Sequence, residues 1–424
     1  MLRVPLQSAK PGMVLALPVY HPRRQDAALL VSGITLDQRS IRRLREIRLP
    51  EVWVEYPPLS FVAEYLNPEI LAAHAGLAHC ISGAFDEMAG EAHAKLDFVS
   101  YRRAITSLLE SLMACPKAAI FVQEMVDRDQ PALRHATTVC YLSLLMGLKL
   151  EDYLITQRSR LRTAAAREVT SLGLGAIFHD VGMLRLDTEV IRRWESTGDE
   201  TDPQWREHVH LGYEMVKGSV SPAAVAAVLH HHQAWDGSGF PRRTMLDGSV
   251  RPISGEDIHV FARIVATANV FDRLHHPASA VQPIPRVRAL KRVRERCVGT
   301  KLDPMTFKAL LSVVPAYAPG SIVTLSSGAR AVVTEWFPED PCRPTVHAGD
   351  NFDHGFDDDG VPLERIALRE QPALSIVEID GVDVSGDNFY PDKPAEFDLR
   401  LAGRALFNGA EFDDEDEDFA RRAG

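Results

Sequence analysis

The sequence has few cysteines and no long apolar segment. Five cysteines are scattered over 424 residues without CxxC spacing, a distribution that favours reduced, mostly buried thiols over a disulfide framework. No run of 18 uninterrupted apolar residues occurs, and the first residues, MLRVPLQSAKPGM, lack the apolar core of a signal peptide. We therefore expect a soluble, cytoplasmic protein without a membrane span.

The chain also lacks the positive charge that is typical of nucleic-acid scaffolds. Its formal net charge is −11, which argues against a nucleic-acid polymer as partner. Part of this acidity is local, because residues 411–418 contain seven acidic residues around one Phe. We interpret residues 401–424 as an acidic, disordered tail, with a docking segment as the alternative.

Hydrophobic periodicity divides the rest of the chain into segments. Residues 1–58 alternate short β-like runs with turn signals and one helix capped by Asp37, which predicts a small α+β module. Residues 59–118 predict a helical connector, and residues 119–318 continue as long segments of helical spacing. Strand-like spacing over residues 319–400 predicts a small β-rich extension. The expected fold is thus multidomain and mainly α, with a helical body between two small modules.

Two polar segments have alternative interpretations. Residues 286–297 (RVRALKRVRERC) predict a basic amphipathic helix, which is typical of a solvated surface; the alternative is a nucleotide or partner patch. Residues 350–360 (DNFDHGFDDDG) predict an exposed loop. Calcium binding is disfavoured there, because the regular carboxylate spacing ending in Glu is missing.

Six residues of metal-binding types recur along the helical part of the sequence. Neutral imidazoles together with a carboxylate hold divalent metals, and such metals activate water. Six groups exceed what one ion uses while it keeps a position open for water, so the count favours two ions that share one carboxylate. The set is His135, His179, Asp180, His208, His231 and His232.

Members of this set also have structural explanations. Taken alone, the pair His179-Asp180 is typical of a capping or hydrogen-bonded pair at the end of an apolar helix. The pair His231-His232 precedes a Trp and a Gly-rich turn. A core position would have to satisfy every buried imidazole nitrogen there, so this pair favours ligation. Two neighbouring histidines are interpreted as bystanders: His210 and His230.

The motifs in residues 119–318 together resemble the HD-GYP domain, a branch of the HD phosphohydrolases associated with bacterial cyclic-di-GMP hydrolysis. The pair His179-Asp180 matches the HD doublet, and residues 231–241 (HHQAWDGSGFP) match the HHExxDGSGYP run. His208 with residues 212–214 matches the HPxxG element. Residues 262–264 and 270–272 match the segment that closes the site. The two flanking modules resemble the small domain and the β extension that accompany some of these domains.

The resemblance implies a role for each matched residue. It assigns water activation to His179 and Asp180, with two divalent ions, iron or manganese, as cofactors. The implied metal ligands are His135, His179, Asp180, His208, His231, His232 and Asn269. The implied contacts to a cyclic dinucleotide or a related phosphorylated nucleotide are Gly239, Phe240, Pro241, Arg263 and Arg273.

The sequence departs from the family pattern at five places. Asn269 stands where the ADxFDAL segment has a metal-binding Asp, which removes one negative charge. Met183 replaces a Lys that meets phosphate, an electrostatic contribution of the kind that supports catalysis. Pro131 replaces a Glu that supports a third metal in some members, and Phe240 replaces the Tyr of GYP. Residues 275–280 lack the basic run that contacts the dinucleotide, for which Arg273 could compensate.

Two functions fit these observations. The first is a metal-dependent phosphodiesterase of the HD-GYP type. The second is a catalytically degenerate signalling module that binds metal or nucleotide and regulates a partner protein. Retention of six ligands favours the first, whereas the departures favour the second. A metal-free helical scaffold is a third, weaker interpretation, and a homodimer is compatible with all three.

Overall fold

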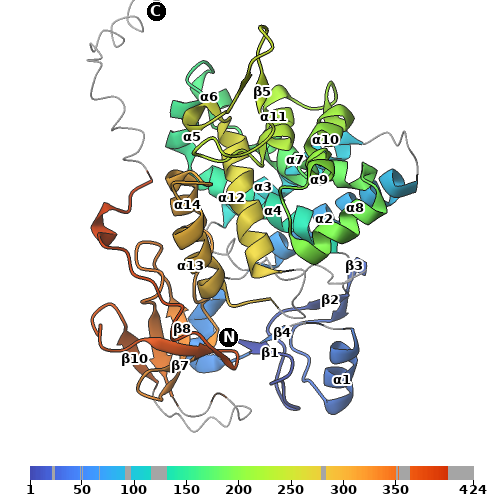
Figure 1. Cartoon of the computed structure of the whole chain (residues 1–424). Coiled ribbons are helices and arrows are strands. Elements are labelled where there is room, and N and C mark those ends of the chain that lie inside the picture. Colours follow the sequence, from blue (N-terminus) through green and yellow to red (C-terminus); the bar gives the residue numbers. More distant parts are fainter. Residues whose placement is uncertain are drawn as a thin grey trace, which may run out of the picture.

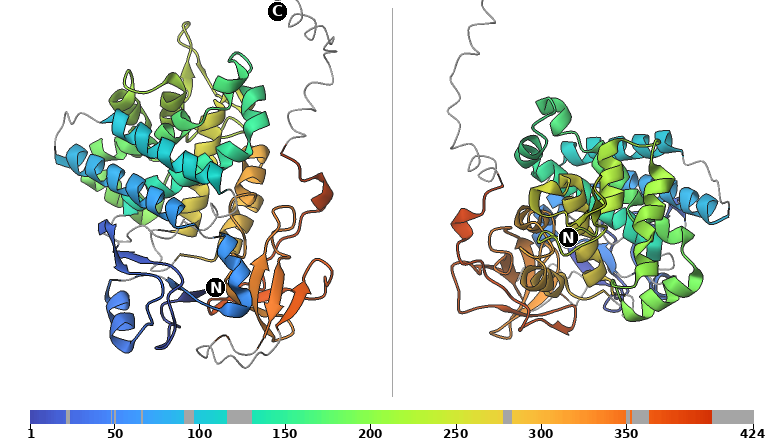
Figure 2. Two further views of the ribbon diagram at one scale, coloured as in Figure 1. Left: turned by 180° about the vertical axis from the view of Figure 1, so that it is seen from behind. Right: turned by 45° about the horizontal axis from the view of Figure 1, so that its top comes forward.

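The structure of the chain is a computed structural model. It describes residues 1–21, 24–47, 49, 51–65, 67–90, 97–115, 131–277, 283–349, 352 and 363–399. A helical body occupies one end of the molecule, and two small β-containing units lie side by side at the other end (Figures 1 and 2). This arrangement confirms the predicted fold class.

The N-terminal unit is a small α+β module. Strand β1 (Leu2–Pro5) pairs antiparallel with β4 (Glu51–Val54), and β2 (Val19–His21) pairs with β3 (Arg24–Leu30). Helix α1 (Gln38–Glu46) begins after Asp37, whose carboxylate accepts a hydrogen bond from the Ser40 amide at 2.6 Å. The predicted cap is therefore present, and it satisfies one of the free amides at the start of the helix.

The helical body follows a short 3-10 segment, η1 (Pro57–Tyr65). Its helices are α2 (Pro68–Gly90), α3 (Phe98–Ala114), α4 (Pro131–Lys149), α5 (Glu151–Gln157), α6 (Thr163–Ala166), α7 (Thr170–Phe178), η4 (Val181–Arg185), α8 (Thr188–Thr197), α9 (Pro203–Arg206), α10 (His208–Val216), α11 (Pro222–His230), η5 (Gly255–Asp257), α12 (Val260–His275), α13 (Arg286–Arg296) and α14 (Pro304–Leu311). A two-stranded hairpin, β5 (Arg243–Thr244) with β6 (Val250–Arg251), projects from this body.

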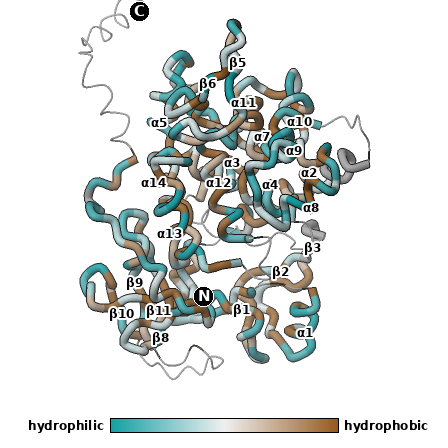
Figure 3. The backbone as a smooth tube through the Cα atoms, in the orientation of Figure 1, coloured by the Kyte–Doolittle hydropathy of each residue, from teal (hydrophilic) through white to brown (hydrophobic). Residues whose placement is uncertain are grey.

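Helix α7 is the centre of the helical body, since every residue from Leu172 to Phe178 is buried. A helix that is apolar on all sides requires neighbours all round it. Small residues permit their close approach: a Cβ on Gly175 would lie 2.7 Å from Cβ of Ala227 in α11. Figure 3 shows hydrophobic stretches along these central helices and mainly hydrophilic loops at the rim. The buried end of α7 delivers the His179-Asp180 doublet.

The C-terminal unit is a six-stranded antiparallel sheet in the order β10-β9-β8-β7-β11-β12. Its strands are β7 (Ile322–Leu325), β8 (Arg330–Glu335), β9 (Thr345–Ala348), β10 (Glu364–Ala367), β11 (Ile376–Ile379) and β12 (Val382–Asp383), followed by η6 (Pro394–Glu396). The predicted loop 350–360 lies outside the described residues except for Phe352, which is buried. The predicted acidic tail 401–424 lies wholly outside them.

The basic helix α13 is not a freely solvated surface, contrary to the interpretation favoured from its sequence. Arg288 Nε donates to the Asp387 carboxylate at 2.8 Å, and Lys291 Nζ donates to the Gly386 carbonyl at 2.6 Å. The basic side chains of α13 therefore contact the C-terminal segment of the same chain. Periodicity identified the helix but carried no information about a segment almost 100 residues away.

The composition-based expectations about thiols and membrane spans have separate outcomes. All five cysteines are free; Cys140, Cys297 and Cys342 are buried, whereas Cys80 and Cys115 are half-buried. None of the helices in the described part of the chain combines the length and the apolarity that crossing a bilayer requires.

The two β-containing units pack together through Gly320. The Arg3 amide donates to the Gly320 carbonyl at 2.9 Å, and Gly320 has a φ of +85°. A Cβ at this position would lie 2.7 Å from the Trp53 ring. Gly320→Ala should therefore lower the free energy of unfolding by about 1–3 kcal/mol through strain and collision. Chemical denaturation of the full chain measures this loss.

Gly328→Ala is the matched control, because Gly328 has the same φ of +85° with no atom within 4 Å of the added Cβ. It should show the strain without the collision. Equal losses for both variants would contradict a tight contact between Trp53 and Gly320.

Candidate metal centre

The six predicted ligands come from four separate parts of the helical body and meet at one place. His135 lies in the second turn of α4, and His179 with Asp180 links α7 to η4. His208 begins α10, and His231 with His232 follows α11. Their ligand atoms form two groups, each with all atoms within 4.8 Å of one another: His135, His179 and Asp180; and Asp180, His208, His231 and His232.

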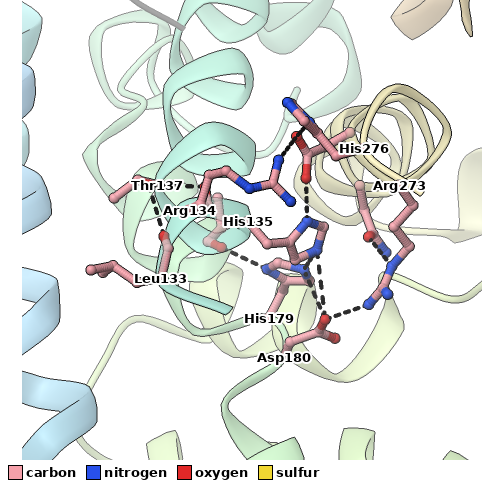
Figure 4. Close-up of polar contacts among 11 residues, drawn as sticks. Leu133, Arg134, His135, Thr137, His179, Asp180, Arg273 and His276 are labelled. Carbon is pink, nitrogen blue, oxygen red and sulfur yellow. Dashed lines mark hydrogen bonds and ion pairs between the residues drawn. The ribbon is translucent and has the colours of Figure 1, made fainter. Parts of the chain in front are cut away.

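Asp180 belongs to both groups because its two oxygens face different histidines. Oδ2 lies 3.5 Å from His179 Nε2 and 3.6 Å from His135 Nε2. Oδ1 lies 3.3 Å from His231 Nε2 and 3.6 Å from His208 Nε2. Figure 4 shows the first group, with the carboxylate below the two imidazoles. One carboxylate thus stands between two clusters of imidazole nitrogens, as a bridging ligand would.

Three of the histidines are oriented by the helix that precedes each of them. His179 Nδ1 donates to the Ala176 carbonyl at 2.7 Å, and His208 Nδ1 donates to the Trp205 carbonyl at 2.7 Å. In the same i−3 pattern, His231 Nδ1 donates to the Val228 carbonyl at 2.8 Å. The last carbonyls of a helix need such donors.

A carbonyl oxygen only accepts hydrogen bonds, so each of these contacts places the imidazole proton on Nδ1. The lone pair is then on Nε2, which faces Asp180. The hydrogen bond that satisfies a free carbonyl at the helix end therefore also selects the tautomer that a metal requires.

Four of the inward-facing atoms have no hydrogen-bond partner among the residues that the structure describes. Asp180 Oδ1 and the Nε2 atoms of His208, His231 and His232 are buried without a hydrogen bond. Leaving buried polar atoms unsatisfied costs on the order of 1–3 kcal/mol each. Nitrogen and carboxylate lone pairs converging in this way fit divalent cations, which would satisfy them together. The residues present therefore fit the metals that the sequence implies.

The protonation of these groups is also suited to ligation. Burial lowers the pKa of His208 to about 4 and those of His179 and His232 well below the usual value. These rings are thus neutral near pH 7, as ligands must be. Burial by itself would raise the pKa of Asp180, but the groups around it, including the charged Arg273 guanidinium, outweigh burial and hold that pKa well below its usual range. Asp180 is therefore an ionised carboxylate.

Asp272 orients His135, a role that the sequence reasoning missed. This carboxylate is almost fully buried; Oδ2 accepts from His135 Nδ1 at 2.6 Å, and Oδ1 accepts from His276 Nδ1 at 2.8 Å. The contact fixes Nε2 of His135 toward Asp180, as a carboxylate behind a ligating histidine does in metal sites. Its spacing was the available signal: Asp272 lies three residues after Asn269, on the same face of α12.

Asn269 and Arg273 lie beside the two-histidine group and contact each other. Arg273 Nη2 donates to Asp180 Oδ2 at 2.6 Å, and its Nε donates to Asn269 Oδ1 at 2.7 Å. The guanidinium carbon is 4.5 Å from the centroid of the Trp194 ring. The amide oxygen predicted as a metal ligand therefore accepts from an arginine. Figure 4 shows the contact of this Arg273 with the shared carboxylate of Asp180.

The GSGFP loop, residues 237–241, places an aromatic ring against the group formed by His208, His231 and His232. Phe240 stacks on His232 with centroids 4.7 Å apart and an interplanar angle of 11°. A Cβ on Gly239 would lie 2.2 Å from the Ala234 amide nitrogen, so only glycine fits there. The Pro241 carbonyl accepts from the Gln233 side chain. Of the three predicted substrate contacts in this loop, Phe240 lines the site, whereas Gly239 and Pro241 shape the loop.

Arg263 has a different role from the substrate contact predicted for it. Its side chain is buried, and Nη1 donates to the Asp303 carboxylate at 2.7 Å and to the Tyr153 hydroxyl. Further hydrogen bonds reach the Ile258 carbonyl and the Gln157 side chain. A guanidinium committed in this way joins α5, α12 and α14 and is not available to a nucleotide.

The two histidines interpreted as bystanders belong to neither ligand group. His210 is exposed on α10, and His230 is half-buried at the end of α11. The neighbours that do converge differ from them by one or two positions, which matches the spacing argument made from the sequence.

Comparison with known proteins agrees with this geometry. Residues 154–305 match the HD domain family. The chain is 24% identical to the cyclic di-GMP phosphodiesterase PA4108 of Pseudomonas aeruginosa, over 74% of this chain and 77% of that protein. It is 38% identical to the cyclic di-GMP phosphodiesterase response regulator RpfG of Xanthomonas campestris over 25% of this chain and 27% of that protein, and 30% identical to a 3'3'-cGAMP-specific phosphodiesterase of Vibrio cholerae over 32% and 27%, respectively.

Among solved structures, a HDG"Y"P protein of Bdellovibrio bacteriovorus, Bd1817, matches with 16% identity and a TM-score of 0.41, covering 73% of this chain and 97% of that one. The family match and the site together define a class: the chain contains an HD domain, the fold of metal-dependent phosphohydrolases. Its relatives and motifs support an HD-GYP phosphohydrolase, in agreement with the resemblance found in the sequence.

A close backbone contact holds the two parts of the site together. A Cβ on Gly182 would lie 1.9 Å from the His208 carbonyl oxygen and 2.6 Å from the Gly212 amide nitrogen. Gly182→Ala must therefore push α10 away from η4. We expect the free energy of unfolding to fall by about 3 kcal/mol and metal binding to be lost. Thermal unfolding and metal analysis measure both effects. Gly76→Ala, where nothing lies within 4 Å, should be neutral or stabilising by up to about 1 kcal/mol; similar behaviour of the two variants would contradict the contact.

The role of Asp272 predicts a second effect on metal binding. Asp272→Asn keeps the shape of the side chain but weakens the acceptor that orients His135, so affinity for Mn²⁺ should fall by about 10–100-fold. Isothermal titration of metal into chelator-treated protein measures the change. Asp202→Asn, at the half-buried N-cap of α9 and outside both ligand groups, is the control and should leave the affinity unchanged. An unaltered Asp272→Asn affinity would mean that His135 needs no such support.

Proposed function

We propose that this protein is a metal-dependent phosphodiesterase that hydrolyses a cyclic dinucleotide in bacterial signalling. The observation that carries the proposal is the position of the Asp180 carboxylate between two groups of inward-facing imidazole nitrogens. The relatives named for cyclic di-GMP and for 3'3'-cGAMP support a cyclic dinucleotide as the substrate class. Enzymes that cleave phosphodiesters frequently use two metal ions in this way.

The ligands divide naturally between two ions. His208, His231 and His232 with Asp180 Oδ1 would hold one ion, and His135 and His179 with Asp180 Oδ2 would hold the other. We propose iron or manganese, which imidazole and carboxylate ligands suit. Bound divalent ions would polarise the phosphodiester and lower the pKa of a water molecule to near 7.

The chain's own residues supply orientation and shape. The i−3 carbonyls and Asp272 keep the imidazole lone pairs directed inward. Phe240 offers a flat face beside His232, suited to an apolar or aromatic part of a nucleotide. Arg273 is the cation nearest to the shared carboxylate, whereas Met183 provides no charge. We propose Arg273 as the basic contact that replaces the missing lysine and basic run.

A non-hydrolytic signalling module is the second candidate function. The Arg273 contacts with Asn269 and Asp180 favour it, because a guanidinium takes a carboxylate oxygen that a catalytic metal would use. Such a module, in the cytoplasm, would bind metal and nucleotide and regulate a protein partner, as a monomer or a homodimer. Hydrolysis separates the two functions directly.

His208→Ala tests the proposal, with His210→Ala as its matched control on the same helix. Removing a buried ligand should lower the kcat/KM for cyclic di-GMP by more than about a hundredfold, whereas loss of the exposed His210 should leave it unchanged. Product formation is followed by chromatography with Mn²⁺ or Fe²⁺, for cyclic di-GMP and for 3'3'-cGAMP in parallel. Absence of product from the unmodified, metal-loaded chain, together with nucleotide binding, would instead establish the signalling module.

A further inference from the structure

The two histidine groups differ in what else touches the shared carboxylate. On the side of His208 and His231, Asp180 Oδ1 is buried and has no hydrogen-bond partner within the described part of the chain. On the side of His135 and His179, Oδ2 already accepts a charge-assisted hydrogen bond from Arg273 at 2.6 Å. The first group is therefore free to accept a cation, whereas the second already has one in contact.

Arg273 is held in this position from three directions. Its Nε donates to Asn269 Oδ1, one helical turn earlier, at 2.7 Å. Its Nη2 donates to Asp180, and its guanidinium lies 4.5 Å from the centroid of the Trp194 ring. The Arg273 side chain is only 23% exposed, so water does not screen this contact fully. A guanidinium fixed by two acceptors and an aromatic ring is part of the built site.

Two side chains within the segment that matches ADxFDAL thus contact each other. Asn269 stands at the Asp of that pattern, and Arg273 stands at its second Ala. The first change removes a negative charge from the site, and the second adds a positive one. Together they shift the local charge by two units in the direction that disfavours a second divalent cation. Neither change leaves a buried group unpaired, because Arg273 and Asn269 satisfy each other.

We propose that Arg273 is a built-in cation that competes with the second metal ion for Asp180 Oδ2, so that the chain binds its two ions with unequal affinity. This inference rests on the proposed metal-dependent function and concerns the order of loading. The three-histidine group takes the first ion. The His135–His179 group takes the second only when the guanidinium leaves the carboxylate. Loading of the second ion is thereby controlled by a side chain of this protein.

Titration of Mn²⁺ into the chelator-treated, full-length protein tests the proposal. Equilibrium dialysis with metal analysis gives the two binding steps. The unmodified chain should show one tight step and a weaker second step. Arg273→Ala and Arg273→Gln should tighten the second step by at least about tenfold, equivalent to about 1.4 kcal/mol, with the first step little changed. Gln keeps a polar group beside Asn269 and serves if the Ala variant folds poorly.

Arg193→Ala is the control for a general charge effect. Arg193 precedes Trp194 in the chain and carries the same charge, but it donates to Asp202, at 2.8 Å from Nε. Its loss should leave both steps as they are in the unmodified chain. An equal tightening in the Arg193 and Arg273 variants, or Arg273 isotherms that superimpose on the unmodified one, would overturn the proposal.

A double substitution tests the contact between the two changed positions. In Asn269→Asp alone, the new carboxylate should pair with Arg273 and tighten the second step only slightly. In Asn269→Asp with Arg273→Ala, the same carboxylate should face the ion, so the combined effect should exceed the product of the two single effects. A strictly multiplicative effect would contradict the coupling.

The titration separates the failure of this inference from the failure of the proposed function. Two steps of equal affinity in the unmodified chain would overturn the role of Arg273 while leaving the phosphodiesterase intact. No Mn²⁺ binding by any variant would overturn both. Unequal steps without hydrolysis would support the inference and refute the enzyme.

Discussion

The site depends on one local constraint, the hydrogen bond from an imidazole Nδ1 to the carbonyl three residues before it. His179, His208 and His231 all make this contact near the C-terminal end of a helix. There the backbone offers acceptors that the helix itself cannot use. The same bond removes rotational freedom from the ring and directs Nε2 inward. The geometry of a metal ligand thus follows from the way in which each helix ends.

Convergence of these helix ends requires unusually close backbones. Gly182 lies against the His208 carbonyl, and Gly175 lies against Ala227, so α7, η4, α10 and α11 approach without intervening side chains. This packing brings Asp180 within reach of histidines from three other segments. The packing leaves a group of buried polar atoms that have no partners among the described residues. A ligand from outside the chain can offset the free-energy cost of leaving them unpaired. Stability and metal binding are therefore linked at this site.

Sequence reasoning could find the ligands but not the residues that support or oppose them. Spacing and residue type identified the Asp37 cap and the His179-Asp180 doublet, because these signals are local. Asp272 supports His135 from 137 positions away, and no local pattern encodes that pairing. Arg263 matched a family motif, yet its buried contact with Asp303 shows that the match reflects packing. A match to a family motif therefore indicates that Arg263 is important, but it does not distinguish a structural role from substrate binding.

Helix α12 brings these supporting and opposing roles together on one rigid element. Arg263 secures its first half to α14 and α5, while its last turns carry Asn269, Asp272 and Arg273 to the site. At about 1.5 Å per residue, roughly 15 Å separates the anchor from the arginine. Because a helix transmits position over this distance, the anchor helps to set how far Arg273 reaches. Arg263, whose hydrogen bonds reach none of the predicted metal ligands, can therefore influence how Arg273 contacts Asp180.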